Sequence, residues 1–474
     1  MRKAGFIISI LISSIFCVSA QNEGNIWYFG YNAGLDFNSG APVALGDGQL
    51  YTLEGCATIA DNNGNLLFYT DGMTVYNKNH TIMQNGTGLL GHNSSTQSAI
   101  IVRKPGSTNI YYIFTVDGYS GRGYGGNNQG LNYSEVDMTL DGGLGDITTN
   151  KNILLIPATC EKVTAIKHQN NSDFWIISRL ENSNTYHSYL LTCSGVNTTP
   201  VITNIGDVYN MTAGYLKASP NGSRIAAANV DYEPSSAGGF DINLCDFDNN
   251  TGLLSNLISL QGVGATRGPY GLEFSPNGNI LYITARPKSA SNNFNSPMFQ
   301  YDLLAGSPTA IVNSRIKIYT GGIDDFGAIQ LAPDGKIYHV LYQRAYLGVI
   351  NNPNIVGSGC NYNPNGCQLA PGTYGGGGLP TFYSSIFNNN SCYGDSTFFN
   401  STNTSADSVL WDFGDPNSGT HNSSTEINPF HIFSDTGTFH ITLYSYFNGM
   451  IDTVVNDLFV TAIPVFNLGN DTVM

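Results

Sequence analysis

Short apolar runs separated by turn residues fill the chain from residue 22 to residue 388. The clearest repeat is Ser or Ala, then Pro, then Asn or Asp, then Gly, followed by an apolar strand, and it occurs in 218–228, 274–283 and 331–340. Proline fixes φ at the first central position of a turn, Asn or Asp tolerates the second, and glycine takes the left-handed conformation. Each phrase therefore predicts a β-hairpin. The turn residues are Pro220, Gly222, Pro276, Gly278, Pro333 and Gly335.

The spacing of these hairpins predicts the architecture. Their glycines are 278 − 222 = 56 and 335 − 278 = 57 residues apart, which suits one four-stranded propeller blade with its loops. Looser copies lie in 59–69, 102–114 and 166–177, and a further blade is expected to join 26–37 with 379–383. We predict an all-β fold with a β-propeller over 22–388. Seven blades fit the spacing best, and six or eight remain alternatives.

The composition changes after residue 388. Runs of alternating apolar and polar residues with turn residues between them predict an immunoglobulin-like β-sandwich over 389–463. The tail, 464–474, is similar to the first strand of another module, so we expect a longer natural chain. Helical patterns with a 3.6-residue period are nearly absent throughout.

Two blocks in this second region resemble the PKD domain family. They are Trp-Asp-Phe-Gly-Asp at 411–415 and Phe-Ser-Asp-Thr-Gly-Thr-Phe at 433–439. The resemblance implies an immunoglobulin-like sandwich of the kind found in extracellular proteins, with Trp and Phe of the first block packed inward and its Asp and Gly residues shaping a turn. The residues that carry the resemblance are Trp411, Asp412, Phe413, Gly414, Asp415 and Gly437.

The region before it resembles propellers of secreted multidomain proteins of the Bacteroidetes, through the phrases at 25–30, 34–37, 65–72 and 86–91. Such relatives often carry a C-terminal sorting domain for type IX secretion, including the gliding-motility-associated type. The sequence shows none before Met474. The resemblance implies an extracellular or outer-surface location, or a periplasmic one if no sorting domain exists.

Targeting and charge agree with export. Residues 1–20 have a basic start, an apolar core over 6–18 and a small-residue cleavage site ending at Ala20, which predicts a signal peptide. No other stretch is apolar enough to predict a transmembrane span. The net charge of −15 argues against a nucleic-acid partner, because such surfaces need clustered Lys and Arg.

Export makes disulfides plausible for the cysteines. Cys360 and Cys367 lie in one loop rich in Asn, Pro and Gly and are the best predicted pair, with Cys160 and Cys193 a second pair. A zinc site is the rival interpretation, but the sequence has no C-x-x-C motif and no nearby pair of histidines.

Several glutamates are candidates for the paired carboxylates of a glycosidase, on the ground of residue type alone. Glu54 and Glu161 lie at blade starts, where they could face the propeller channel, although turn or ion-pair roles are favoured for every glutamate. The carboxylates considered are Glu54, Glu135, Glu161, Glu233 and Glu273. Exposed tyrosines for stacking on sugars are Tyr119, Tyr124 and Tyr133, with ordinary packing as the alternative.

No cofactor is predicted. The loops at 61–64 and 246–252 are faintly similar to calcium loops, but neither has the full ligand spacing, and Asx turns explain both. The hypothesis that follows is a non-catalytic extracellular binding or adhesion protein for a protein or glycan partner, with the second domain as a spacer. The alternative is a secreted glycan-degrading enzyme with its active site at the propeller funnel.

Overall fold

The computed structural model describes 22–118, 126, 129–170, 172–208, 213–229, 241–261, 266–287, 295–322, 325–384, 396–399, 407–426, 429–447 and 450–460. The predicted signal peptide (1–20), the predicted boundary at 388 and the tail 464–474 lie outside these residues. The limits of the two predicted domains therefore stay predictions.

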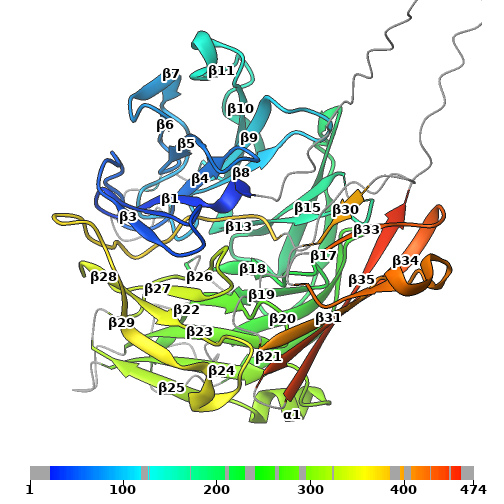
Figure 1. Cartoon of the computed structure of the whole chain (residues 1–474). Coiled ribbons are helices and arrows are strands. Elements are labelled where there is room, and N and C mark those ends of the chain that lie inside the picture. The colour runs from blue at the N-terminus through cyan, green and yellow to red at the C-terminus, as the bar shows by residue number, and fades with distance from the viewer. Residues whose placement is uncertain are drawn as a thin grey trace, which may run out of the picture.

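The described part of the chain before residue 385 forms seven consecutive antiparallel blades around one axis (Figure 1). Blades 2 and 3 join into one nine-stranded sheet only through a single parallel bridge between Gln84 and Asp146. Blade 1 has β1 (Ile26–Phe29), β2 (Ala33–Asp36) and β3 (Val43–Leu45). Blade 2 has β4 (Ala57–Ala60), β5 (Leu66–Thr70), β6 (Thr74–Asn77) and β7 (Ile82–Thr87). Blade 3 has β8 (Ala99–Arg103), β9 (Ile110–Val116), β10 (Leu131–Asp137), β11 (Asp146–Ile147) and β12 (Ile153–Ile156).

The later blades follow the same order. Blade 4 has β13 (Thr159–Lys167), β14 (Phe174–Leu180), β15 (Thr185–Thr192), β16 (Gly195–Val196) and β17 (Val201–Asn204). Blade 5 has β18 (Leu216–Ala218), β19 (Arg224–Ala228), β20 (Asp241–Asp248) and β21 (Leu253–Gln261). Blade 6 has β22 (Thr266–Phe274), β23 (Ile280–Pro287), β24 (Ser296–Asp302) and β25 (Ile316–Gly321), with the short helix α1 (Pro308–Asn313) before β25. Blade 7 has β26 (Ile329–Leu331), β27 (Ile337–Val340), β28 (Tyr346–Ile350) and β29 (Tyr362–Gln368).

The first strand of each of blades 2 to 7 lies nearest the centre, and the later strands lie outward (Figure 1). The repeated Pro-Asn-Gly phrases and the Pro-Asp-Gly phrase form the hairpins between the first and second strands of blades 5, 6 and 7, respectively. Their glycines, Gly222, Gly278 and Gly335, have φ of 68°, 72° and 74°, which glycine adopts without strain. The prediction of an all-β propeller is confirmed.

Most of the hydrophobic core lies between neighbouring blades. One cluster joins Ile100 of blade 3 to Val163 and Ile176 of blade 4, smaller clusters join blades 2 and 3, 4 and 5, and 6 and 7, and the largest cluster joins blade 1 to blades 2, 5, 6 and 7. Blades 1 and 7 close the ring where the Trp27 ring packs edge-on against Tyr338, with ring centroids 5.8 Å apart. Closure of this kind protects the inner strand edges from pairing with another chain.

The predicted closing strand at 379–383 is wrong in its position. The bridge to blade 1 is made by Tyr374, which pairs with Tyr31, whereas Pro380 pairs with Cys56 and Ser384 pairs with Ile166. Residues 374–384 therefore do not complete one blade. They leave blade 7 and reach several others, and they contact blade 1 again through the Phe382 ring, whose centroid lies 5.9 Å from that of Trp27.

The predicted Cys360–Cys367 disulfide is not formed, and both residues are free thiols. Cys360 packs with Tyr282 between blades 6 and 7, whereas Cys367 belongs to the cluster on the other face of blade 7. Side chains on opposite faces of a sheet cannot bridge without moving the backbone. Cys160 and Cys193 are free as well, the first buried and the second exposed.

The C-terminal described residues form an immunoglobulin-like β-sandwich, as predicted. One sheet pairs β30 (Ser396–Phe398) with β33 (Phe430–Ile432). The other has the order β32 (Ser423–Ser424), β31 (Ser408–Asp412), β34 (Gly437–Phe447) and β35 (Met450–Val460). Trp411 and Phe413 are buried in its core together with Phe433.

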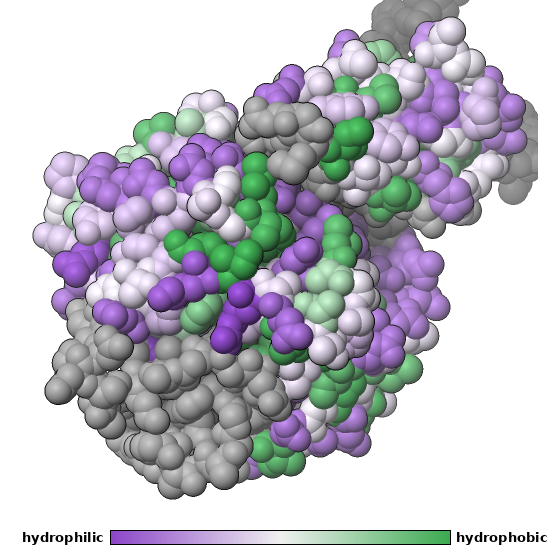
Figure 2. Space-filling view, turned by 90° about the horizontal axis from the view of Figure 1, so that it is seen from below, coloured by the Kyte–Doolittle hydropathy of each residue, from purple (hydrophilic) through white to green (hydrophobic). Residues whose placement is uncertain are grey.

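The surface is a mosaic of hydrophilic and hydrophobic residues, and the hydrophobic ones gather in small groups on the face shown in Figure 2. Among the described residues, no helix is both long and apolar enough to cross a bilayer.

Candidate functional site at the propeller axis

A polar connector between blades 2 and 3 occupies the axis. Ser95, Thr96, Gln97 and Ser98 are fully buried. The Gln97 side chain donates to the Leu216 carbonyl (3.2 Å) and accepts from the Leu216 amide (2.7 Å), although blade 4 separates the two blades in the chain. A connector before blade 3 that binds a strand of blade 5 must cross the centre of the ring.

The Thr96 hydroxyl ties further blades to this connector. It donates to Oε2 of Glu161 on blade 4 (3.0 Å) and accepts from the backbone amide of Gly214 before blade 5 (3.2 Å). The backbone amide of Thr96 donates to the same carboxylate oxygen (3.1 Å). The backbone and the side chain of Thr96 thus both bind the Glu161 carboxylate.

Residues 374–384 form a second crossing of the axis. The Gly377 carbonyl accepts from the Ala328 amide of blade 7 (2.9 Å), and its amide donates to the Leu53 carbonyl before blade 2 (2.5 Å). Farther along, the Ser384 amide donates to the Ala165 carbonyl of blade 4 (3.0 Å). The crossing lies between the upper and lower blades in Figure 1.

The glycines at 375–378 are explained by this crossing. A Cβ atom on Gly378 would lie 2.1 Å from the Glu54 carbonyl oxygen, and one on Gly376 would lie 2.7 Å from the Leu53 carbonyl oxygen. Only glycine lets the two backbones approach this closely.

Glu54 and Glu161, the two glutamates expected to face the channel from the starts of their blades, lie near each other at the axis. Burial and, to a lesser extent, the charge of Glu161 raise the pKa of Glu54 to about 8, although Arg286 and the Tyr270 hydroxyl act in the opposite direction. Glu54 is partly accessible and Glu161 is buried. Glu54 therefore keeps its proton at neutral pH, and its neutral carboxyl can donate a hydrogen bond or a proton.

Two aromatic rings pack against the Arg286 guanidinium, which lies near Glu54. The Arg286 guanidinium lies 4.4 Å from the centroid of the Phe326 ring and 5.2 Å from that of Tyr270. Tyr270 is fully buried, and its ring contacts Tyr215 edge-on. We call Glu54, Glu161, Tyr270 and Arg286 the axial cluster. The sequence does not reveal Tyr270 or Arg286, because no motif links them to the glutamates.

Buried lysines near the axis have structural partners. Lys162 donates to the carbonyls of Ala213 (3.1 Å) and Ala228 (2.7 Å), and burial lowers its pKa to about 8. Lys217 forms an ion pair with Glu273 (3.0 Å) and also donates to Gln330. The contacts of Lys162 join blade 4 to blade 5, and those of Lys217 join blade 5 to blades 6 and 7.

The other predicted candidates lie apart from the axial cluster. Glu135 accepts from the Tyr112 hydroxyl (3.0 Å) within blade 3, and Glu273 is the partner of Lys217. Tyr133 packs against Tyr112 at 5.6 Å between ring centroids. Glu233, Tyr119 and Tyr124 lie outside the described residues.

The two loops compared with calcium sites form Asx turns. Asp61 accepts from the backbone amides of Asn63 and Asn65, and Asp248 accepts from those of Asn250 and Thr251. Within the described residues, no group of three or more metal-ligating side chains gathers at one point.

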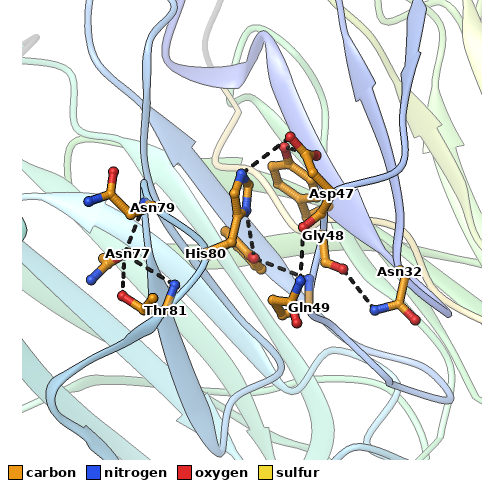
Figure 3. Close-up of polar contacts among 10 residues, drawn as sticks. Asn32, Asp47, Gly48, Gln49, Asn77, Asn79, His80 and Thr81 are labelled. Carbon is orange, nitrogen blue, oxygen red and sulfur yellow. Dashed lines mark hydrogen bonds and ion pairs between the residues drawn. The ribbon is translucent and has the colours of Figure 1, made fainter.

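A second polar cluster joins blades 1 and 2 (Figure 3). Asp47 accepts from the Tyr28 hydroxyl (2.8 Å) and lies 3.4 Å from Nε2 of His80, whose Nδ1 is 3.0 Å from the Tyr69 hydroxyl. His80 has φ of 60°, and the Asn77 side chain holds its turn. The residues lock the connector before blade 2 against the strands of blades 1 and 2.

The signature residues of the sandwich lie in and around one turn. Asp412 accepts from the Gly414 amide (3.0 Å), and Gly414 has φ of 63° with His440 backbone atoms directly beside it. Gly437 begins β34 with φ of 130°. The Trp411 indole donates to the Glu426 carbonyl (3.1 Å).

Asp415 is the buried acceptor of this turn. It accepts from Nε2 of His431 (3.0 Å) and from the amide (2.8 Å) and hydroxyl of Ser434. Burial alone would raise the pKa of Asp415, but the hydrogen bonds from Ser434 and His431 lower it below its ordinary value. The side chain therefore joins this turn to His431 and Ser434.

No protein-family model and no curated protein matches this sequence. Solved structures similar to the chain include a candidate 6-phosphogluconolactonase of Bacteroides fragilis, with 13% identity, a TM-score of 0.38, and coverage of 84% of this chain and 92% of that one. The extracellular domain of a candidate one-component system of B. thetaiotaomicron has 11% identity and a TM-score of 0.40, covering 94% of this chain and 57% of that one.

A third similar structure is a quinoprotein alcohol dehydrogenase-like protein of Bacteroides thetaiotaomicron. It has 11% identity and a TM-score of 0.36, with coverage of 70% of this chain and 73% of that one. At identities and scores this low, these similarities do not bear on the activity of this chain.

Proposed function

We propose that this protein is a non-catalytic extracellular binding or adhesion protein. The propeller presents its loops and rim to a protein or glycan partner. The C-terminal sandwich, through its resemblance to PKD domains, acts as a spacer. The signal-peptide pattern at 1–20 and the resemblance to secreted propeller proteins support a secreted or cell-surface location.

The observation that carries the proposal is the filled axis. Thr96 and Gln97 connect blades 3, 4 and 5 at the centre, and residues 374–384 cross the same region. Propeller enzymes of the funnel type need a substrate to enter along this axis. In this protein the chain itself occupies the path, so recognition is left to the face and rim.

A glycan-degrading enzyme is the second candidate, and the axial cluster favours it. Glycosidases use two carboxyl groups whose environments push their pKa values apart. Glu54, with its pKa raised to about 8, has the property of a general acid, and Glu161 is close enough to influence it. Against this role, Thr96 binds Glu161 twice and would have to release it for base or nucleophile chemistry.

Binding and hydrolysis can be measured on the same preparation of the mature chain. We expect binding on a glycan array or in a pull-down from an extracellular fraction, with no reducing ends released from a polysaccharide panel. The contrary result is hydrolysis that Glu54→Gln and Glu161→Gln both abolish. Glu135→Gln is the control, because Glu135 lies outside the axial cluster.

A further inference from the structure

Three tyrosines occupy neighbouring cross-strand positions where blades 1 and 7 meet. Tyr31 forms antiparallel bridges with Tyr51 on one side and Tyr374 on the other. Tyr31 and Tyr374 exchange both backbone hydrogen bonds, at 2.9 and 3.2 Å. The Tyr31–Tyr51 pair is instead flanked by the hydrogen bonds of the adjacent residues, at 2.8 and 3.0 Å.

This register sets the direction and spacing of the side chains. Residues directly opposite each other in antiparallel strands project from the same face. Their Cα atoms are about 5.5 Å apart in a hydrogen-bonded pair and about 4.5 Å apart in a non-hydrogen-bonded pair. Tyr51, Tyr31 and Tyr374 thus form a row on one face, and we call it the tyrosine row.

The middle of the row is fixed and its ends are open. The Tyr31 ring contacts the Tyr51 ring at 4.8 Å between centroids, and its hydroxyl lies 3.4 Å from that of Tyr342. Tyr51 is 73% exposed and Tyr374 is 44% exposed. Tyr51 is the most exposed large apolar side chain in the described part of the molecule, so most of its ring is open to solvent.

The side chains next to Tyr31, at the centre of the row, are polar and carry no charge. The amide of the exposed Gln343 donates to the Tyr342 hydroxyl (3.4 Å). Phenol rings offer an apolar face for the C–H surface of a sugar ring, while phenol hydroxyls and side-chain amides exchange hydrogen bonds with sugar hydroxyls. The net charge of −15 disfavours an anionic ligand.

The shape of the row distinguishes a glycan from a protein partner. A standard protein interface covers about 800 Å² per partner around an apolar centre. The tyrosine row is one residue wide, and its spacing of about 5 Å is close to the width of one pyranose ring. The Tyr31 and Tyr51 rings meet edge-on, at 61° between their planes, so the open stacking faces belong to the two ends of the row. We infer that the tyrosine row binds a neutral pyranose-containing glycan, with sugar rings on Tyr51 and Tyr374. The inference rests on the proposed binding function and names its ligand class.

The test is titration calorimetry of the mature chain with neutral tetrasaccharides built from glucose, mannose, xylose or N-acetylglucosamine. Tyr51→Ala and Tyr374→Ala should each weaken binding about tenfold, because each removes one stacking ring. Tyr51→Phe keeps the ring and should retain most of the affinity. Phe430→Ala, which removes a ring that is 57% exposed in the sandwich, is the matched control and should change nothing.

The outcomes separate this inference from the proposed function. Glycan binding that survives both alanine variants overturns the tyrosine row and leaves the binding function standing. Capture of a protein or of an anionic polysaccharide, with no affinity for the neutral sugars, overturns the neutral glycan as the ligand class. Hydrolysis of the glycans without their retention on the protein overturns both the tyrosine row and the binding function. Thermal melting of each variant should stay within about 2 °C of the parent, because these are surface substitutions.

Discussion

The Glu54 carboxyl keeps its proton to about pH 8, because burial and the charge of Glu161 both disfavour its ionised form. The same carboxyl in the unfolded chain titrates at its ordinary value of 4.5. Between these two values the folded state binds one more proton than the unfolded state. The free energy of unfolding therefore falls as pH rises from 4.5 to about 8.

The magnitude follows from the same two values. A change from 4.5 to about 8 sets an upper limit of about 5 kcal/mol at alkaline pH. Glu54 is partly accessible, and screening by water reduces the expected loss to about 2 kcal/mol. Glu54→Gln preserves the shape of the side chain and removes its charge. The variant should match the parent near pH 4.5 and exceed its stability by about 2 kcal/mol above pH 8.

Guanidinium unfolding of the parent, Glu54→Gln and the control Glu135→Gln at several pH values measures this difference. Glu135 binds hydroxyl groups within blade 3 and lies outside the axial cluster, so its variant should follow the parent at every pH apart from a constant offset. If the curves for Glu54→Gln and the parent stay parallel from acid to alkaline pH, the electrostatic account of the axial cluster is wrong.

Three further substitutions test the axial crossing, the connector between blades 2 and 3, and the turn of the sandwich. Gly378→Ala places a Cβ 2.1 Å from the Glu54 carbonyl oxygen and should cost about 3 kcal/mol in chemical unfolding; an unchanged midpoint would contradict the axial crossing. Gln97→Leu leaves the buried Leu216 amide and carbonyl without their side-chain partner and should cost about 2 kcal/mol by the same assay. Asp415→Asn should destabilise the sandwich by about 2 kcal/mol at neutral pH. Because the pKa of Asp415 is lowered, this difference should shrink as pH falls below 3.8, and a pH-independent difference would refute the charge argument.

The propeller was predictable because its signals are local. A Pro-Asn-Gly turn specifies a hairpin through the φ values of three residues, and a spacing of 56 or 57 residues repeats the blade. Burial of Trp411 and Phe413 was an expectation from the resemblance to PKD domains, and both residues lie in the core of the sandwich. The approach of Glu54 to Glu161 was partly predictable, since both lie at blade starts and all blade starts gather at the axis.

The remaining features depend on contacts between distant segments. Cys360 and Cys367 are seven residues apart in sequence, but Cys360 packs between blades 6 and 7, whereas Cys367 packs in the cluster on the other face of blade 7. The course of 374–384 across the axis depends on groups from several blades, and only its four glycines hint at a close backbone approach. The tyrosine row joins residues 31, 51 and 374 through two single bridges, which leave no periodic pattern in the sequence.

The central claim is that the propeller binds its partner without transforming it. The most direct measurement incubates the mature chain with the polysaccharide panel and records both the bound fraction and the reducing ends released. We expect retention of at least one neutral glycan with no increase in reducing ends. Release of reducing ends that disappears in both Glu54→Gln and Glu161→Gln, while Glu135→Gln remains active, would contradict it.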